Sequence, residues 1–164
     1  MPRRSSRPQR APLGSAYEAG IRLLARRAHS RVELRRKLVR RGYDGDEVDE
    51  ILARLERQGY VDDAAFAVGH VRRRAVSLGP LALSAELSAR GVDRRLADAA
   101  LAGFDQAAQL AAATKLAERL SGSRRPAGFR ELLDSVGPKL LRRGYSQGVA
   151  REACRAIWAG TGQA

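Results

Sequence analysis

One short pattern of residues recurs three times along this chain of 164 residues. Arg41-Gly42-Tyr43-Asp44 returns as Arg90-Gly91-Val92-Asp93 and again as Arg143-Gly144-Tyr145-Ser146, with the glycines 49 and 53 residues apart. Glycine tolerates the left-handed backbone that ends many helices, and Asp or Ser is favoured at the N-cap that begins the next one. Each copy therefore predicts a helix that stops, a tight turn and a new helix.

Apolar residues keep the same distances from each glycine. The positions four and eight residues earlier lie on one helical face. Four residues before the glycines are Leu38, Leu87 and Leu140, and eight residues before them are Leu34, Leu83 and Val136. The position 13 residues later is also apolar, as Leu55, Phe104 and Ile157. Together with a longer leading helix in each copy, this periodicity predicts an all-α protein. We expect three tandem three-helix repeats forming an elongated, curved body.

Composition and breaker residues set the expected boundaries. The first 14 residues are rich in Pro, Arg and Ser and have little to bury, which is typical of a disordered segment. Gly79-Pro80 and the stretch 121–126 separate leading helices from their successors. We expect a disordered basic arm at 1–14, repeats at 15–60, 61–104 and 105–158, and a flexible tail at 159–164.

Positive charge is concentrated near the N-terminus. The net charge is +13, and residues 1–41 hold 13 Lys and Arg against Glu18 and Glu33, a net of +11. The remaining residues carry 18 basic and 16 acidic side chains, a net of only +2. This asymmetry favours a partner that is nucleic acid or contains it. The alternative is that the basic side chains only keep the helices solvated.

Several classes of function find no support in the sequence. Cys154 is the single cysteine, so an internal disulfide and a multi-cysteine metal site are excluded. His29 and His70 lack a zinc-binding spacing, and there is no glycine-rich phosphate loop. We expect no catalytic residues, no metal and no cofactor. No apolar run reaches the length of a membrane span, so we expect a cytoplasmic protein without membrane contact.

Four stretches of the chain resemble the RecX family. They are LLARRAHSRVELRRKL (23–38) with Arg41-Gly42-Tyr43, the linking segment LERQGYVDDAAFA (55–67), Gly79-Pro80 with Glu86-Leu87 and Arg90-Gly91-Val92, and KLLRRGYS (139–146). The linking segment and the last stretch are the most specific. The resemblance covers roughly residues 17–158.

The resemblance implies three helical repeats, no catalysis and a role in homologous recombination, DNA repair and the SOS response. It implies binding to the filament of the RecA recombinase and modulation, usually inhibition, of its activities. Single-stranded DNA is an implied partner, directly or within the filament. Family members commonly carry basic residues in the second helix of the middle repeat, whereas residues 81–89 of this chain contain none. The nearby Arg72, Arg73 and Arg74 are the replacement that we expect.

Three basic clusters are the candidate contacts with the filament or nucleic acid. Arginine suits them because its planar guanidinium can make two hydrogen bonds to one phosphate. Cations are also favoured near helix C-termini, so a solvated face is the alternative for each cluster. The candidates are Arg35, Arg36, Lys37, Arg40 and Arg41; Arg72, Arg73 and Arg74; and Lys139, Arg142 and Arg143.

Two functional hypotheses remain open. In the first, a monomeric chain binds the RecA filament. In the second, the chain is a plain DNA-binding helical module that acts without RecA. The residues after the repeated glycines, Tyr43, Val92 and Tyr145, are expected to pack against their turns, with base stacking as the alternative. Cys154 is expected to be a small buried hydrophobe.

Overall fold

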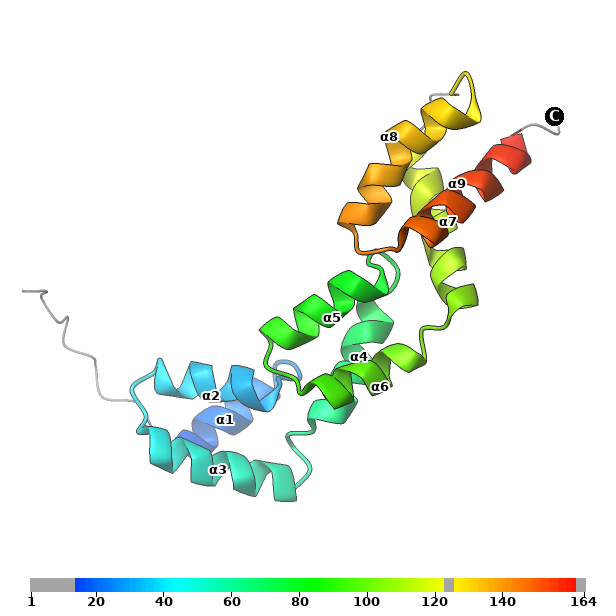
Figure 1. Cartoon of the computed structure of the whole chain (residues 1–164). Coiled ribbons are helices and arrows are strands. Elements are labelled where there is room, and N and C mark those ends of the chain that lie inside the picture. Colours follow the sequence, from blue (N-terminus) through cyan, green and yellow to red (C-terminus); the bar gives the residue numbers. More distant parts are fainter. Residues whose placement is uncertain (1–13, 123–125, 162–164) are drawn as a thin grey trace, which may run out of the picture. The chain divides into compact units, whose positions relative to one another are not determined.

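The computed structural model describes residues 14–122 and 126–161, and these ranges contain nine α-helices and no strand (Figure 1). The predicted all-α fold is confirmed. Nearly all of the expected N-terminal arm and the end of the expected tail, residues 162–164, lie outside the described residues. The helices group into two compact units, residues 1–66 and residues 67–164. The boundary falls within one helix.

The first unit holds three complete helices, α1 (Ala16–Leu24), α2 (Arg31–Val39) and α3 (Gly45–Arg57), and the start of α4 (Asp63–Arg74). Each complete helix begins at a side-chain cap. Ser15 forms a capping box with Glu18, and the Ser30 hydroxyl accepts the Glu33 N–H. The Asp44 carboxylate accepts two backbone N–H groups in the first turn of α3. Caps of this kind contribute about 1 kcal/mol each.

Leucine, valine and alanine side chains fill the core of the first unit. The fully buried members are Ala16, Leu34, Leu38, Val48, Leu52 and Leu55. Tyr43 follows the first repeated glycine and is only 7% exposed, and its hydroxyl donates to the Gly14 carbonyl 3.2 Å away. A residue so enclosed packs against the turn, as the sequence predicted.

The second unit contains the rest of α4 and five further helices. They are α5 (Pro80–Ala89), α6 (Arg94–Ala102), α7 (Gln106–Ser121), α8 (Phe129–Arg142) and α9 (Gln147–Thr161). Helix α9 packs on both α7 and α8. It continues to Thr161, so residues 159–161 of the expected tail are helical. Cys154 lies in the core of this unit with no exposed surface, and burial raises the pKa of its thiol.

The repeated glycines have the predicted conformation. Gly42, Gly91 and Gly144 all have left-handed backbones, with φ of +93°, +75° and +85°. The residues four and eight positions before each glycine are completely buried. Asp44 and Asp93 cap the following helices with their carboxylates, and the Ser146 hydroxyl accepts the Val149 N–H in the third copy. The repeat pattern therefore predicted both the stops and the starts of these helices.

The third repeated turn also caps a helix of the second copy. Helix α5 starts after Gly79, which has no side chain to cap it. Instead, the Gly79 N–H donates to the Arg143 carbonyl at 2.8 Å, and the Leu81 N–H donates to the Gly144 carbonyl at 3.1 Å. A Cβ on Gly144 would overlap the backbone of Ala82. Gly144 thus serves two purposes, a left-handed turn and a close approach between helices.

Candidate functional site

The basic cluster of α2 divides into paired and exposed side chains. Arg35 makes a bidentate ion pair with Asp49 on α3, with Nε and one Nη each 2.8 Å from a carboxylate oxygen. This hydrogen-bonded pairing raises the pKa of Arg35 and lowers the pKa of Asp49. The Arg35 guanidinium is thus already committed to joining two helices.

The other members of this cluster lie at the C-terminal end of α2. Arg36 and Arg40 are exposed, and the Arg40 Nε donates to the Arg36 carbonyl at 3.3 Å. Lys37 is half-buried. Arg41, one residue before the repeated glycine, is exposed and has no ion pair with a described residue. It is the member best placed to meet an external anion.

The cluster at the end of α4 shows the same division. Arg74 pairs with Glu86 on α5, with an Nη 2.8 Å from one carboxylate oxygen, and His70 lies 2.7 Å from the other. The hydrogen bond from Arg74 lowers the pKa of Glu86. Arg72 and Arg73 are exposed, and neither pairs with a described acidic side chain. Two of the three arginines therefore point to solvent with their charge unbalanced.

In the third cluster, two side chains contact backbone carbonyls. Lys139 Nζ lies 3.5 Å from the Leu120 carbonyl in the last turn of α7, where a cation is favoured. Arg143 donates to the Ser77 carbonyl at 3.3 Å, in the turn after α4. Arg142 is exposed and makes no such contact with the described part of the chain. These contacts bring Arg143 to the end of the helix that carries Arg72 and Arg73.

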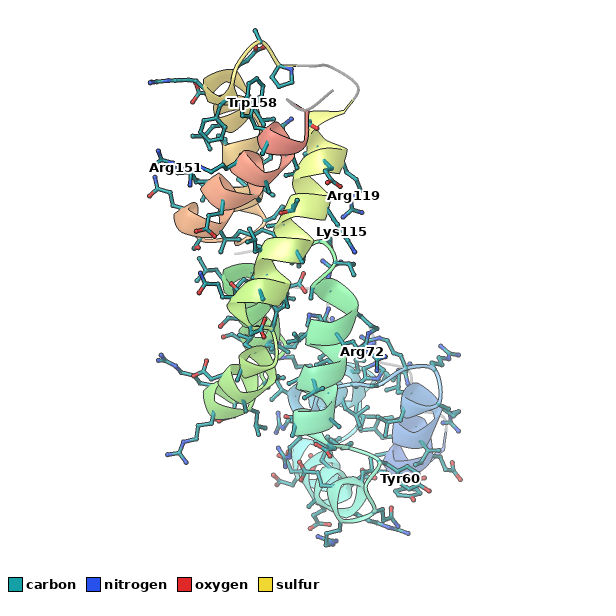
Figure 2. All side chains as sticks on the ribbon, turned by 90° about the vertical axis from the view of Figure 1, so that its right-hand side faces the viewer. Tyr60, Arg72, Lys115, Arg119, Arg151 and Trp158 are labelled. Carbon is teal, nitrogen blue, oxygen red and sulfur yellow. The ribbon has the colours of Figure 1, made fainter. Side chains whose placement is uncertain are left out.

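Sequence reasoning missed two further cations near this turn. Arg119 on α7 donates to the Val76 carbonyl at 3.0 Å, beside the Ser77 carbonyl that Arg143 contacts. Lys115 lies one helical turn before Arg119, and both are exposed. Figure 2 shows them on the same side of the second unit, opposite Arg151. Their i, i+4 spacing was the available signal, but the proximity of α4 depends on tertiary structure.

The described residues offer no sign of a metal centre or a membrane span. Within residues 14–122 and 126–161, no group of three or more His, Cys, Asp and Glu side chains could hold a metal ion. None of the helices in these ranges is long and apolar enough to cross a bilayer. The arrangement is therefore a set of exposed cations on helical supports. Chemically, such a set can bind phosphates or carboxylates.

Family models match the first and middle parts of the chain. The model for the first three-helix domain of RecX matches residues 16–55, and the model for its second three-helix domain matches residues 62–101. Two crystal structures share the fold. One, of RecX from Lactobacillus salivarius, has a TM-score of 0.79 at 23% identity and covers 88% of this chain and 95% of that one. The other, of a regulatory protein RecX, has a TM-score of 0.74 at 27% identity, covering 82% and 68%.

Curated relatives called regulatory protein RecX match most of the chain. The relative from Mycobacterium ulcerans (strain Agy99) is 40% identical over 80% of this chain and 78% of its own length. The one from Mycobacterium sp. (strain JLS) is 37% identical over 94% of this chain and 87% of its own length. The relative from Geobacillus kaustophilus is 36% identical over 79% of this chain, and the match spans about half of its length, 49%.

Proposed function

The chain belongs to the RecX family of regulatory proteins, and from this premise we propose that it regulates the RecA recombinase by binding the filament that RecA forms on single-stranded DNA. The observation that carries the proposal is the match to relatives called regulatory protein RecX over most of the chain. The expected outcome of binding is inhibition of RecA. The chain acts as a monomer and by binding rather than by catalysis.

The exposed arginines support contact with the phosphates of the filament's DNA. Arg41 in the first unit, and Arg72, Arg73 and Arg142 in the second, are exposed and have no ion pair with a described residue. Each guanidinium can offer two parallel hydrogen bonds to a phosphate. We place the strongest nucleic-acid contacts at these four residues. The remaining members of the three basic clusters contribute charge around them.

A plain DNA-binding module is the second candidate function. It is favoured by the same exposed arginines, because contacts to phosphate require no RecA. The two proposals differ in what makes binding tight. A filament-binding protein gains affinity from protein contacts with RecA, whereas a plain module binds bare DNA equally well or better.

Binding to bare and RecA-coated DNA distinguishes the two candidates. A biotinylated oligonucleotide is immobilised either bare or coated with RecA and a slowly hydrolysed ATP analogue, and the chain is titrated by biolayer interferometry. We expect binding at least about tenfold tighter on the coated DNA, a difference of about 1.4 kcal/mol. RecA without DNA is the control.

The DNA-dependent ATPase of RecA gives an independent readout of function. Addition of the chain should lower the rate of ATP hydrolysis at concentrations that saturate the coated DNA. Equal affinity for both DNA surfaces, together with an unchanged ATPase rate, would establish the plain DNA-binding module instead.

A further inference from the structure

A groove in the second unit runs beside α7, between this helix and the turn that follows α4. It encloses about 460 Å³. Small or aliphatic side chains, Val76, Ala108, Ala111 and Ala112, line it, and Lys115 and Arg119 stand at its edge. We call it the α7 groove. An apolar floor with a charged edge is a common composition for a binding surface.

Further exposed aliphatic side chains lie on α4 and on the turn that lines the groove. Val68 and Arg72 lie four residues apart on one side of α4, and Val76, which lines the groove, follows two residues after the helix ends. Val68 is 56% exposed and Val76 is 64% exposed. Large aliphatic side chains grouped with a groove and unbalanced cations indicate contact with a partner, whereas scattered ones do not.

The chemistry of the α7 groove disfavours a nucleobase. Bases bind by stacking on exposed aromatic or arginine side chains, or by hydrogen bonds to their edges. The aromatic side chain that lines the groove, Phe104, is only 6% exposed. The lining side chains other than Lys115 and Arg119 carry no polar atoms. Aliphatic side chains are the better match for this floor.

The spacing of the alanines indicates the shape of the occupant. Ala108, Ala111, Ala112 and Lys115 repeat at three- and four-residue intervals along α7, so they form one strip of its surface. Alanine side chains are short, and the distance between packed helices depends on the side chains at the contact. A second helix can therefore lie close against this strip.

The two cations at the edge of the groove indicate that the occupant is negatively charged. Arg119 is held in place because it donates to the Val76 carbonyl at 3.0 Å, and this bond uses only one of its five N–H donors. Lys115 has no ion pair with a described acidic side chain. Carboxylates of a partner could form ion pairs with both Lys115 and Arg119.

We propose that the α7 groove docks an acidic amphipathic helix of a partner protein. Its aliphatic side chains would rest on the alanine floor and its carboxylates would meet Lys115 and Arg119. This inference goes beyond the proposed function, because it holds whether or not the chain acts on RecA.

A synthetic peptide tests the proposal directly on the full chain. The probe is a fluorescein-labelled helical peptide about 18 residues long, since shorter helices are marginal in water. It carries Leu on one face and Glu on the flanks, and a comparison peptide carries Lys in place of each Glu. We expect saturable binding of the acidic peptide by fluorescence anisotropy, and at least about tenfold weaker binding of the basic one.

Two matched pairs of variants locate the contact. Ala108→Glu places a carboxylate in the groove and should weaken the acidic peptide about tenfold or more, whereas Ala107→Glu places it one residue earlier on exposed surface and should not. Lys115→Gln should weaken binding roughly two- to fivefold, as the loss of one exposed ion pair does. Arg151→Gln removes the same charge on the opposite side of the unit (Figure 2) and should have no effect. Thermal melts verify that each variant is folded.

Three results would overturn the proposal. The first is the absence of saturable binding of the acidic peptide to the parent chain. The second is equal binding by the parent and the folded Ala108→Glu variant. The third is that Ala108→Glu and Lys115→Gln weaken an oligothymidine probe and leave the peptide unaffected, which would make the groove a nucleic-acid site.

Discussion

His29 occupies a buried position in the first unit where a second proton would have no acceptor. The side chain is 3% exposed, and its Nδ1 lies 2.9 Å from the Arg27 carbonyl. A carbonyl only accepts, so Nδ1 carries the proton of the neutral ring. Nε2 is buried without a partner among the described residues. Burial, and then the charge of Arg27, lower the pKa of His29.

The lowered pKa predicts a loss of stability in mild acid. The unfolded state takes up the proton near pH 6.5, whereas the folded state resists it until lower pH. This contribution is present in full well above pH 6.5 and is lost as the pH falls through 6.5 towards the folded pKa. We expect the free energy of unfolding, from urea titrations, to decrease between about pH 7.5 and 5.5. His29→Asn keeps an N–H donor but cannot titrate, so its decrease should be smaller. Equal decreases in both proteins would contradict this role.

Substitutions at two glycines with the same backbone conformation can distinguish the cost of a left-handed turn from the cost of disturbing close packing. Gly59 and Gly144 have φ of +75° and +85°. Space around Gly59 is open, whereas a Cβ on Gly144 would overlap Ala82. Gly59→Ala should therefore cost about 1–2 kcal/mol of unfolding free energy. Gly144→Ala should cost about 1–3 kcal/mol more, because the cap of α5 must shift. Equal costs in chemical denaturation would show that this contact contributes nothing.

At the scale of helices, local signals predicted most of the starts and stops, although α9 continues to Thr161, beyond the expected end at residue 158. Ser30, Asp44 and Asp93 act within one helical turn, and the repeated glycines stop helices by their own conformation. Contacts between distant segments could not be predicted in this way. The cap of α5 comes from the carbonyls of Arg143 and Gly144, which lie 64 and 63 residues after the N–H groups that they accept from (143 − 79 and 144 − 81).

The candidate site was only partly predictable for the same reason. The sequence located the basic clusters, but it could not distinguish paired from exposed side chains within them. Arg35 meets a carboxylate on the next helix, whereas Arg41 faces solvent. The α7 groove depends on packing between α7 and the turn after α4, and no short motif marks it.

Arg35 and Arg41 should consequently respond differently to the same substitution. Arg35→Gln removes the bidentate pair with Asp49 and should lower the melting temperature more than Arg41→Gln does. Arg41→Gln should weaken binding to single-stranded DNA more, since its guanidinium is available to phosphate. Melting curves and anisotropy titrations on both variants measure the two effects. If Arg35→Gln weakens DNA binding as strongly while remaining folded, then its ion pair opens on binding.

For the molecule as a whole, the positions of the positive charges matter more for DNA binding than their total. The sequence placed most of the excess positive charge in residues 1–41, yet three of the four exposed, unpaired arginines assigned to DNA lie in the second unit. The second unit nevertheless carries a net charge of +8 (16 − 8), because eight of the 16 acidic residues after position 41 lie in residues 42–66. Some of its acidic side chains are also paired within the fold, as Glu86 is with Arg74. The net charge of only +2 over residues 42–164 therefore conceals a basic second unit, which suits contact with phosphate.

Two charge-matched quadruple variants test this distribution. Each lowers the net charge from +13 to +9 (13 − 4), and each changes one residue in the first unit and three in the second. The test variant replaces the assigned contacts by Gln, at Arg41, Arg72, Arg73 and Arg142. The control replaces exposed arginines elsewhere, at Arg57, Arg95, Arg151 and Arg155.

The salt dependence of DNA binding should distinguish the two variants. The slope of log K against log salt is negative, and each lost phosphate contact on single-stranded DNA makes it shallower by about 0.7. The slope of the test variant should therefore be shallower by about 3, and that of the control should change much less. Anisotropy titrations over a range of salt concentrations give both slopes, and melting curves show that the fold is retained. Long-range attraction depends on total charge and is screened by salt, so it would change both variants alike. Equal slopes would therefore assign binding to the overall field of the protein and remove the four arginines from the proposed interface.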